Sequence, residues 1–202
     1  MSVINNIKVY GLEESIKRAK YPMAADITNL DDTLTKGINN LGMAKAGTGH
    51  SNFLKGIVVQ FDLSFTVKAW TEAERYHFFD IVSSQSTMHR ITRFNLDTAY
   101  IKYTDPRVIE IMKEKVEEYN ALEDQISIDS ESLQKMREEK YLEILYTNPC
   151  GFTLTAGMST NYLQLKTIYQ QRRTHKLPEW REFCEEIKKL PHSEWITGEV
   201  VE

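Results

Sequence analysis

The fold is decided by one stretch of this sequence, Ile57-Val58-Val59-Gln60-Phe61-Asp62-Leu63-Ser64-Phe65-Thr66-Val67. β-branched and aromatic residues dominate the stretch, and both kinds are typical of strands. Its second half alternates apolar and polar side chains, which puts Phe61, Leu63, Phe65 and Val67 on one face. The stretch therefore predicts a long strand with one buried face.

Amphipathic patterns on both sides of this strand predict a mixed fold of helices and strands. Residues 11–20 carry acids early and bases late, as a helix dipole prefers. Thr71 and Glu74 have the spacing of a capping box, so apolar residues up to about Val82 are expected on one helix. Further helices are expected at 30–41 (ending at Gly42), at 106–122, after a polar break at 123–129 up to about 146, at 161–173 and after Pro178, and further strands at 7–10 and 152–156.

The composition is that of a globular protein. The chain has 202 residues, 41% of them hydrophobic, and no internal repeat or linker, so residues 1–202 are expected to form one α+β domain. No apolar run is long enough for a membrane span, and the first residues lack a signal-peptide pattern, so a cytoplasmic location is expected. Cys150 and Cys184 lie far apart without metal-type spacing, which favours reduced thiols and no metal site. The net charge of −4 argues against binding to bulk nucleic acid.

A polar run from Ser83 to Arg93 has the composition of an anion site. It holds small hydroxyls, an amide, an imidazole and two arginines, and arginine offers a planar fork to phosphate. The alternative is a solvated loop. A second basic cluster lies far along the chain, between Arg172 and Arg181. If the fold brings the two clusters together, they suit a small phosphorylated ligand.

Other motifs are weaker. In the turn Gly49-His50-Ser51, the imidazole and hydroxyl have the chemistry to contact a ring edge or a phosphate, although a purely structural turn is the alternative. The sequence has no P-loop, no dinucleotide-binding glycine motif, no zinc signature and no nucleophile elbow. Hydrolase chemistry therefore has no positive support.

The order of these pieces resembles the flavin-dependent thymidylate synthase family. Four short motifs carry the resemblance: Ser15-Ile16-Lys17-Arg18-Ala19, Gly49-His50-Ser51-Asn52-Phe53, Ser83-x-Gln85 with Arg90, and Asn161 with Leu165, Arg172 and Trp180. The chain departs from the family where the signature Arg-His-Arg is replaced by Phe78-Phe79-Asp80. The family's Asn-Ala-Arg is likewise replaced by Asn161-Tyr162-Leu163.

The resemblance implies a fold, ligands and site residues. The implied fold is a central antiparallel sheet with flanking helices, assembled as a homotetramer with sites between subunits. The implied ligands are a dUMP-type pyrimidine nucleotide and FAD. The implied nucleotide-binding residues are Ser83, Gln85, Ser86, Arg90 and Arg172, and the implied cofactor-binding residues are His50, Ser51 and Asn161.

Three functions are compatible with these observations. The first is a divergent enzyme of this family, which would use FAD to methylate or otherwise modify a pyrimidine nucleotide. The second is a catalytically inactive protein on the same fold that sequesters or senses a nucleotide, as a bacteriophage could use. The third is an oligomeric structural protein without a small-molecule site. Replacement of the family's cations by Phe78-Phe79-Asp80 is the feature that separates the first two.

Overall fold

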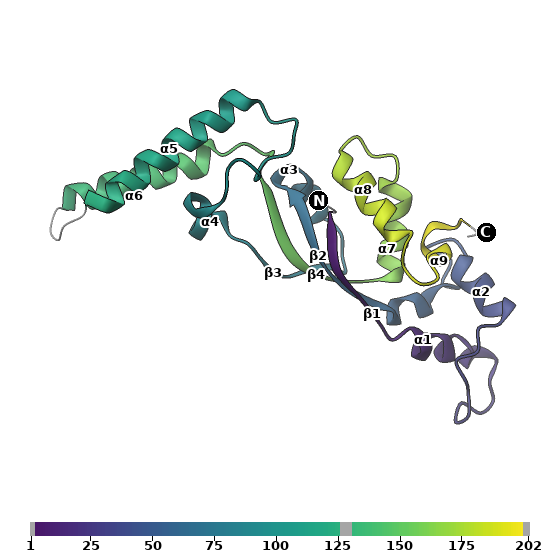
Figure 1. Cartoon of the computed structure of the whole chain (residues 1–202). Helices are drawn as coiled ribbons and strands as arrows, with labels where there is room; N and C mark the ends of the chain where they lie inside the picture. The colour runs from purple at the N-terminus through teal and green to yellow at the C-terminus, as the bar shows by residue number, and fades with distance from the viewer. Residues whose placement is uncertain (1–2, 126–130, 200–202) are drawn as a thin grey trace. The chain divides into compact units, whose positions relative to one another are not determined.

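A computed structural model describes residues 3–125 and 131–199, and it confirms the predicted α+β fold (Figure 1). The strands are β1 (Ile4–Tyr10), β2 (Val58–Thr66), β3 (Phe79–Ser84) and β4 (Thr153–Asn161). The helices are α1 (Leu12–Ala19), α2 (Lys36–Met43), α3 (Val67–Ala73), α4 (Thr87–Arg90), α5 (Pro106–Gln125), α6 (Glu131–Thr147), α7 (Tyr162–Arg172), α8 (Pro178–Ile187) and α9 (Glu194–Thr197), with 3₁₀ turns η1 (Tyr21–Met23), η2 (Asn52–Gly56) and η3 (Ile91–Arg93). The predicted polar break at 123–129 begins inside α5, and its part from 126 onward lies outside the described residues.

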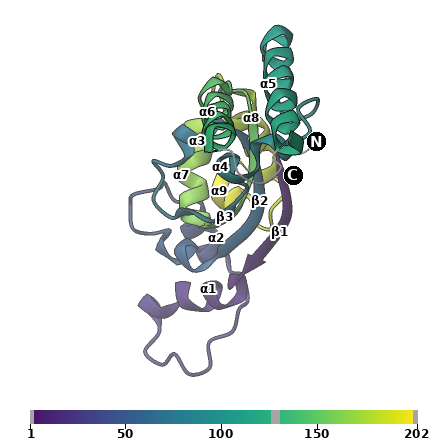
Figure 2. The ribbon, with the colours of Figure 1, turned by 90° about the vertical axis from the view of Figure 1, so that its left-hand side faces the viewer.

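The strands form a sheet of order β1-β2-β4-β3. β1 pairs antiparallel with β2, from Ile4 opposite Leu63 to Tyr10 opposite Val58, and Figure 2 shows β1 at the edge of the sheet beside β2. A register shift between Asn5 and Lys8 interrupts the ladder. The strands predicted at 7–10, 57–67 and 152–156 are therefore confirmed in place, although β1 and β4 are longer than expected.

The chain divides into two compact units. The first unit comprises Met1–Ser64, Thr71–Ser83 and Ala156–Glu202, and the second comprises Phe65–Trp70 and Ser84–Thr155. Each unit is described below by itself. A single domain over residues 1–202 stays a prediction.

The core of the first unit is aromatic. Phe79 of β3 packs against Phe61 of β2 and against Trp180 and Phe183 of α8, with ring centroids 5.7 to 6.5 Å apart. The faces predicted to be buried on α7 and α8 are buried as expected. Cys184 lies on the buried face of α8, where burial raises the pKa of its thiol to about 12. This cysteine is therefore an inert packing residue.

Lys166 of α7 is a buried cation that holds the end of α2. Only 2% of its surface is exposed, and its Nζ donates to the carbonyl oxygens of Gly42 at 2.7 Å and Ala44 at 2.5 Å. Burial lowers the pKa of this ammonium group. The carbonyls at a helix C-terminus lack intrahelical partners, so Lys166 satisfies groups that would otherwise be unpaired inside the protein.

The helix predicted over 30–41 begins later than expected. Thr35 is its N-cap and accepts a hydrogen bond from the backbone N–H of Ile38 at 3.3 Å. Asp31 is instead used in a turn, where it accepts from the N–H of Thr33 at 3.1 Å. Gly42 does not end the helix: it lies inside α2, where a Cβ atom would approach the Trp195 ring to 2.6 Å. Its small size serves packing.

The predicted helix over 71–82 is wrong. A shorter helix, α3, begins earlier: Thr66 at the end of β2 caps it by accepting the N–H of Ala69 at 3.2 Å, and α3 ends at Ala73. Phe78 then adopts a left-handed φ of 58°, which a helix does not tolerate. Residues 79–84 continue as strand β3, in which only Phe79 is buried. The capping-box spacing was a coincidence of sequence.

The second unit contains the hairpin of α5 and α6, which run side by side (Figure 1). Its core includes Met112, Val116 and Tyr119 of α5 and Ile144 of α6. Ion pairs such as Lys140 with Glu118 join the solvent sides of the two helices. Ile111 of α5 is 45% exposed. Val67, predicted to continue the strand at 57–67, instead begins α3.

Candidate functional site

A cavity of about 810 Å³ lies in the second unit, among α4, η3, α5 and α6. Three arginines line it: Arg90 at the end of α4, Arg93 in η3 and Arg137 in α6. His89 and Glu138 line it as well, and Glu138 is the single carboxylate among the described lining residues. We call it the arginine cavity.

One face of α6 forms a wall of the arginine cavity. Gln134, Arg137, Glu138 and Tyr141 follow one another at spacings of three, one and three residues, which places them on adjoining positions of one helix face. The Tyr141 hydroxyl donates to the carbonyl oxygen of Met88 at 3.0 Å and so ties α6 to α4. The wall is therefore built by regular helix geometry and one cross-link.

Two tyrosines add aromatic surface to the cavity. The rings of Tyr119 and Tyr141 lie 5.2 Å apart, and the Arg137 guanidinium lies over the Tyr119 ring at 5.0 Å. Burial, with Tyr119 nearby, raises the pKa of the Tyr141 phenol, and the charge of Arg90 acts in the opposite direction. Tyr141 therefore stays neutral beside a cation.

Arg90 is available to a ligand. Its guanidinium makes no hydrogen bond or ion pair with any residue in the described parts of the chain, and the residue is exposed. A guanidinium in a concave site beside two further arginines attracts anions and offers phosphate a bidentate contact. The cavity has the chemistry of an anion site.

The other predicted residues of the polar run lie elsewhere. Ser83 is exposed on β3 in the first unit. Gln85 is used by the fold: its N–H donates to the Thr155 carbonyl oxygen and its Oε1 accepts from the Thr155 N–H, both at 2.9 Å. Ser86 precedes α4 and accepts the Arg90 backbone N–H at 3.1 Å. Of the residues predicted to bind the nucleotide, Arg90 lines the arginine cavity.

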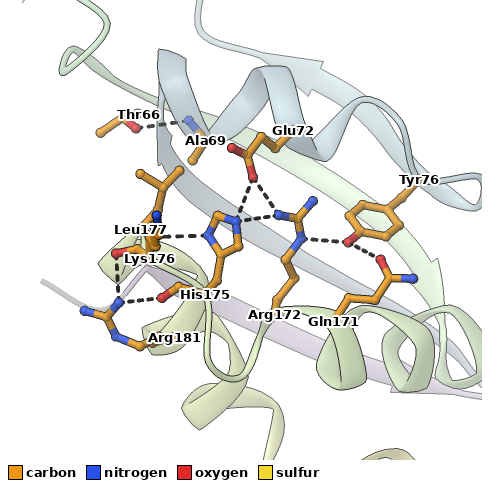
Figure 3. A network of polar contacts seen from close by, with 10 residues as sticks. All are labelled: Thr66, Ala69, Glu72, Tyr76, Gln171, Arg172, His175, Lys176, Leu177 and Arg181. Atoms are coloured by element: carbon orange, nitrogen blue, oxygen red, sulfur yellow. Dashed lines mark hydrogen bonds and ion pairs between the residues drawn. The ribbon is translucent and has the colours of Figure 1, made fainter.

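Arg172 is held in a polar network of the first unit (Figure 3). It is 4% exposed, and it donates through Nη1 to Glu72 at 2.6 Å and through Nε to the Tyr76 hydroxyl at 2.7 Å. Its guanidinium also stacks over the Trp180 ring at 4.8 Å. Tyr76 in turn donates to the side-chain oxygen of Gln171 at 2.8 Å. We call this set the Arg172 network.

His175 completes the Arg172 network as a neutral ring. Its Nδ1 accepts the backbone N–H of Leu177 at 3.2 Å, which places the proton of the neutral ring on Nε2. Nε2 lies 3.1 Å from the Glu72 carboxylate and 2.8 Å from Nη1 of Arg172. Burial lowers the pKa of His175, and the positive charges of Arg172 and Arg181 lower it further, against the carboxylate of Glu72. Protonation of the neutral ring would place the second proton on Nδ1 and so remove the hydrogen bond that Nδ1 accepts from Leu177.

The residues that the resemblance assigns to the cofactor lie in the first unit. His50 is exposed in a turn, and Ser51 is 1% exposed. Asn161 is the N-cap of α7, where its side-chain oxygen accepts the Gln164 N–H at 2.9 Å. At the replaced signature, Phe78 is 64% exposed and Phe79 is 4% exposed.

Sequence reasoning did not assign to the site the residues that α5 and α6 contribute to the arginine cavity, namely Tyr119, Gln134, Arg137, Glu138, Tyr141 and Leu142. Arg93 and His89 stood in the polar run but were not chosen. Arg137 belongs to a segment dense in Glu and Lys, so the sequence does not distinguish it from an ordinary charged surface residue. The spacing of Arg137 and Tyr141 at i and i+4 was the available sign that a charged helix presents a mixed face.

Across residues 3–125 and 131–199, no helix is both long and apolar enough to cross a membrane. In the same residues, no group of three or more His, Cys, Asp or Glu side chains is placed to hold a metal ion.

Comparison with known proteins identifies the fold. No protein-family model and no curated protein matches the sequence. Solved structures do match. The flavin-dependent thymidylate synthase ThyX from Helicobacter pylori, complexed with FAD and dUMP, superposes with a TM-score of 0.65 at 16% identity, over 96% of this chain and 97% of that one. A second crystal structure of that enzyme with FAD and dUMP gives 0.67 at 14% identity, over 98% and 97%.

A further match is the UMP/dUMP methylase PolB from Streptomyces cacaoi bound with 5-Br dUMP. It gives a TM-score of 0.60 at 14% identity, over 98% of this chain and 94% of that one. The likeness thus spans almost the whole of each chain. This chain has the fold of the flavin-dependent thymidylate synthase ThyX.

Proposed function

We propose that this chain binds a pyrimidine nucleotide of the dUMP type and holds its phosphate in the arginine cavity. The observation that carries the proposal is Arg90, whose guanidinium lies in the cavity without a partner among the described residues. Arg93 and Arg137 add positive charge, and Tyr119 and Tyr141 offer ring faces on which a base stacks. These are the contacts that a nucleotide requires.

The size and charge of the arginine cavity agree with this ligand. About 810 Å³ falls within the range of roughly 300 to 1,000 Å³ that small-molecule pockets occupy. The described lining contributes three guanidiniums and one carboxylate, a net charge of two when His89 is neutral. A phosphomonoester carries close to two negative charges at neutral pH. The neighbours of known structure were solved with dUMP or 5-Br dUMP, which supports the same ligand class.

FAD-dependent modification of the base is the second candidate, favoured by the neighbours that contain FAD. Two positions of this chain disfavour the cofactor. The Asn161 oxygen is occupied as a helix cap, and Phe79 is buried among aromatic rings where the family has an imidazole. The replaced cations remove charge-assisted contacts to the flavin and the nucleotide. Nucleotide binding is therefore the better supported of the two functions.

Calorimetric titration tests the proposal. We expect the wild-type chain to bind dUMP and to bind deoxyuridine much more weakly, because deoxyuridine lacks the phosphate. Arg90→Ala should weaken dUMP binding by about tenfold to a hundredfold, the loss of one charged hydrogen-bonding group. Arg173→Ala is the matched control, because Arg173 is an exposed arginine of the first unit. Equal affinity of Arg90→Ala and wild type for dUMP would contradict the proposal.

Absorbance of the purified protein separates the two candidates. Flavin colour, or saturable uptake of added FAD, supports the enzyme. A colourless protein that takes up no FAD but binds dUMP supports the binding protein.

The homotetramer and the cytoplasmic location also belong to this proposal, the first from the resemblance and the second from the sequence. Light scattering of the purified chain tests the assembly, with four chains per particle as the expected result.

A further inference from the structure

We propose that Glu138 determines specificity in the arginine cavity by accepting an N–H of the nucleobase, so that the site selects a uracil-type ring. The inference rests on the proposed function and deepens it. It concerns the base, whereas the proposed function was argued from the phosphate.

Glu138 is a carboxylate in a cavity whose three arginines favour a negative charge. It is the only acidic residue among the described residues that line the cavity, and it would repel a bound phosphate. It is exposed, and it forms no ion pair with Arg90, Arg93, Arg137 or any other residue in the described parts of the chain. An ionised carboxylate only accepts hydrogen bonds. Its position is explained if the ligand brings a donor to it.

The position of Glu138 on α6 shows where that donor lies. Gln134 precedes it by four residues on the same helix face, and Tyr141 follows it by three. At a rise of about 1.5 Å per residue, the wall from Gln134 to Tyr141 is roughly 10 Å long, enough to follow a nucleotide from phosphate to base. Arg137 adjoins Glu138 on this wall, so we expect the phosphate at Arg90 of α4 and Arg93 of η3 and the base beside Glu138.

The edge of uracil matches these two side chains. It presents a ring N–H flanked by two carbonyl oxygens, so Glu138 accepts the N–H and the Gln134 amide donates to a neighbouring carbonyl. The Gln134 amide is free for this role, since it makes no hydrogen bond with a described residue. Cytosine has an unprotonated ring nitrogen at the same position, and a carboxylate repels it. The site should thus prefer dUMP to dCMP.

A cycle of two ligands and two proteins tests the inference. dUMP and N3-methyl-dUMP are titrated into wild type and Glu138→Ala. We expect wild type to prefer dUMP by about tenfold or more, the value of a hydrogen bond to a charged group. Glu138→Ala should bind both ligands alike. Inorganic phosphate should bind Glu138→Ala as tightly as wild type or more tightly, because a like charge is gone, whereas mere structural damage would weaken it.

Glu139→Ala is the matched control, because Glu139 is an exposed carboxylate of the same helix that does not line the cavity. It should keep the preference for dUMP. If Glu138→Ala still discriminates against N3-methyl-dUMP, or if wild type binds dCMP as tightly as dUMP, the inference is overturned while the proposed function stands. If wild type binds no dUMP, both are overturned.

Discussion

Arg90 and Arg172 carry the same group and matched the same family pattern, yet the fold uses them in opposite ways. Arg90 lies in the arginine cavity without a partner among the described residues. Arg172 is buried, paired with Glu72, and stacked on an aromatic ring. The difference arises from the neighbours, because a carboxylate at 2.6 Å pairs with the Arg172 guanidinium, whereas no carboxylate of residues 3–125 and 131–199 pairs with that of Arg90. Availability of a charge, more than its presence, marks a candidate site.

The largest effect expected from this comparison is on stability. Arg172→Met should lower the free energy of unfolding by about 3 kcal/mol, because it leaves Glu72 in a partly buried site without its cation. This is the lower end of the range for broken buried pairs, since 21% of the Glu72 side chain remains exposed. Urea denaturation measures the effect.

The double variant Glu72→Gln with Arg172→Met serves as its control. It removes the stranded charge, so it should be more stable than Arg172→Met alone. A single variant as stable as wild type would show that the Arg172 network does not hold the first unit.

A smaller effect is expected at Arg90, and it concerns binding. Arg90→Lys keeps the charge but loses the planar fork, so dUMP affinity should fall by about tenfold while the urea midpoint stays within error. Titration calorimetry measures the affinity. Undiminished affinity would mean that Arg90 acts only as a point charge.

A further prediction concerns Asn161, which the fold uses as a helix cap and the family resemblance assigns to the cofactor. Asn161→Ala should cost about 1 kcal/mol of stability, because it removes the side-chain cap of α7. Asn161→Ser is the matched control, since serine also caps helices well. Denaturant midpoints compare the three proteins. A loss in Asn161→Ala that Asn161→Ser fails to restore would argue for a role other than capping.

The smallest effect expected is a dependence of stability on pH. The pKa of His175 in the fold is below its ordinary value of 6.5, so the unfolded chain binds this proton first as pH falls. Its contribution to stability is therefore complete above 6.5 and declines below it, until the folded ring is itself protonated. His175→Gln should reduce this decline in urea midpoints measured between about pH 7.5 and pH 5. An identical slope in both proteins would mean that the ring titrates alike folded and unfolded.

Much of the fold could be predicted from the sequence, because its strongest patterns are local. The strand at 57–67 and the helices at 161–173 and after Pro178 have periodic apolar faces that burial alone explains. The segment 71–82 could not be predicted in this way. Its apolar spacing predicts a helix, but Thr66 caps an earlier helix and Phe78 has a left-handed φ that ends helical structure. Only the tertiary structure shows both features.

The site was less predictable than the fold. Arg90 was found because it lies in the polar run from Ser83 to Arg93, whose composition predicts an anion site. Gln85 and Arg172 also carry polar groups that could bind a ligand. In the fold, however, the backbone of Thr155 pairs with Gln85, and the carboxylate of Glu72 pairs with Arg172. Arg137 and Glu138 were missed because they lie on a helix whose charges resemble an ordinary solvated surface. Pairing between distant segments is what one sequence does not reveal.

Lys166 has a consequence for how the first unit opens. Two carbonyls at the end of α2 accept hydrogen bonds from one ammonium group of α7. If α2 detaches from α7, the Lys166 ammonium group is left buried without its partners unless α7 also opens to solvent. The amides of the two helices should then exchange with deuterium at similar rates, as one cooperative segment. Lys166→Met should uncouple them: α2 would exchange faster while α7 keeps its protection.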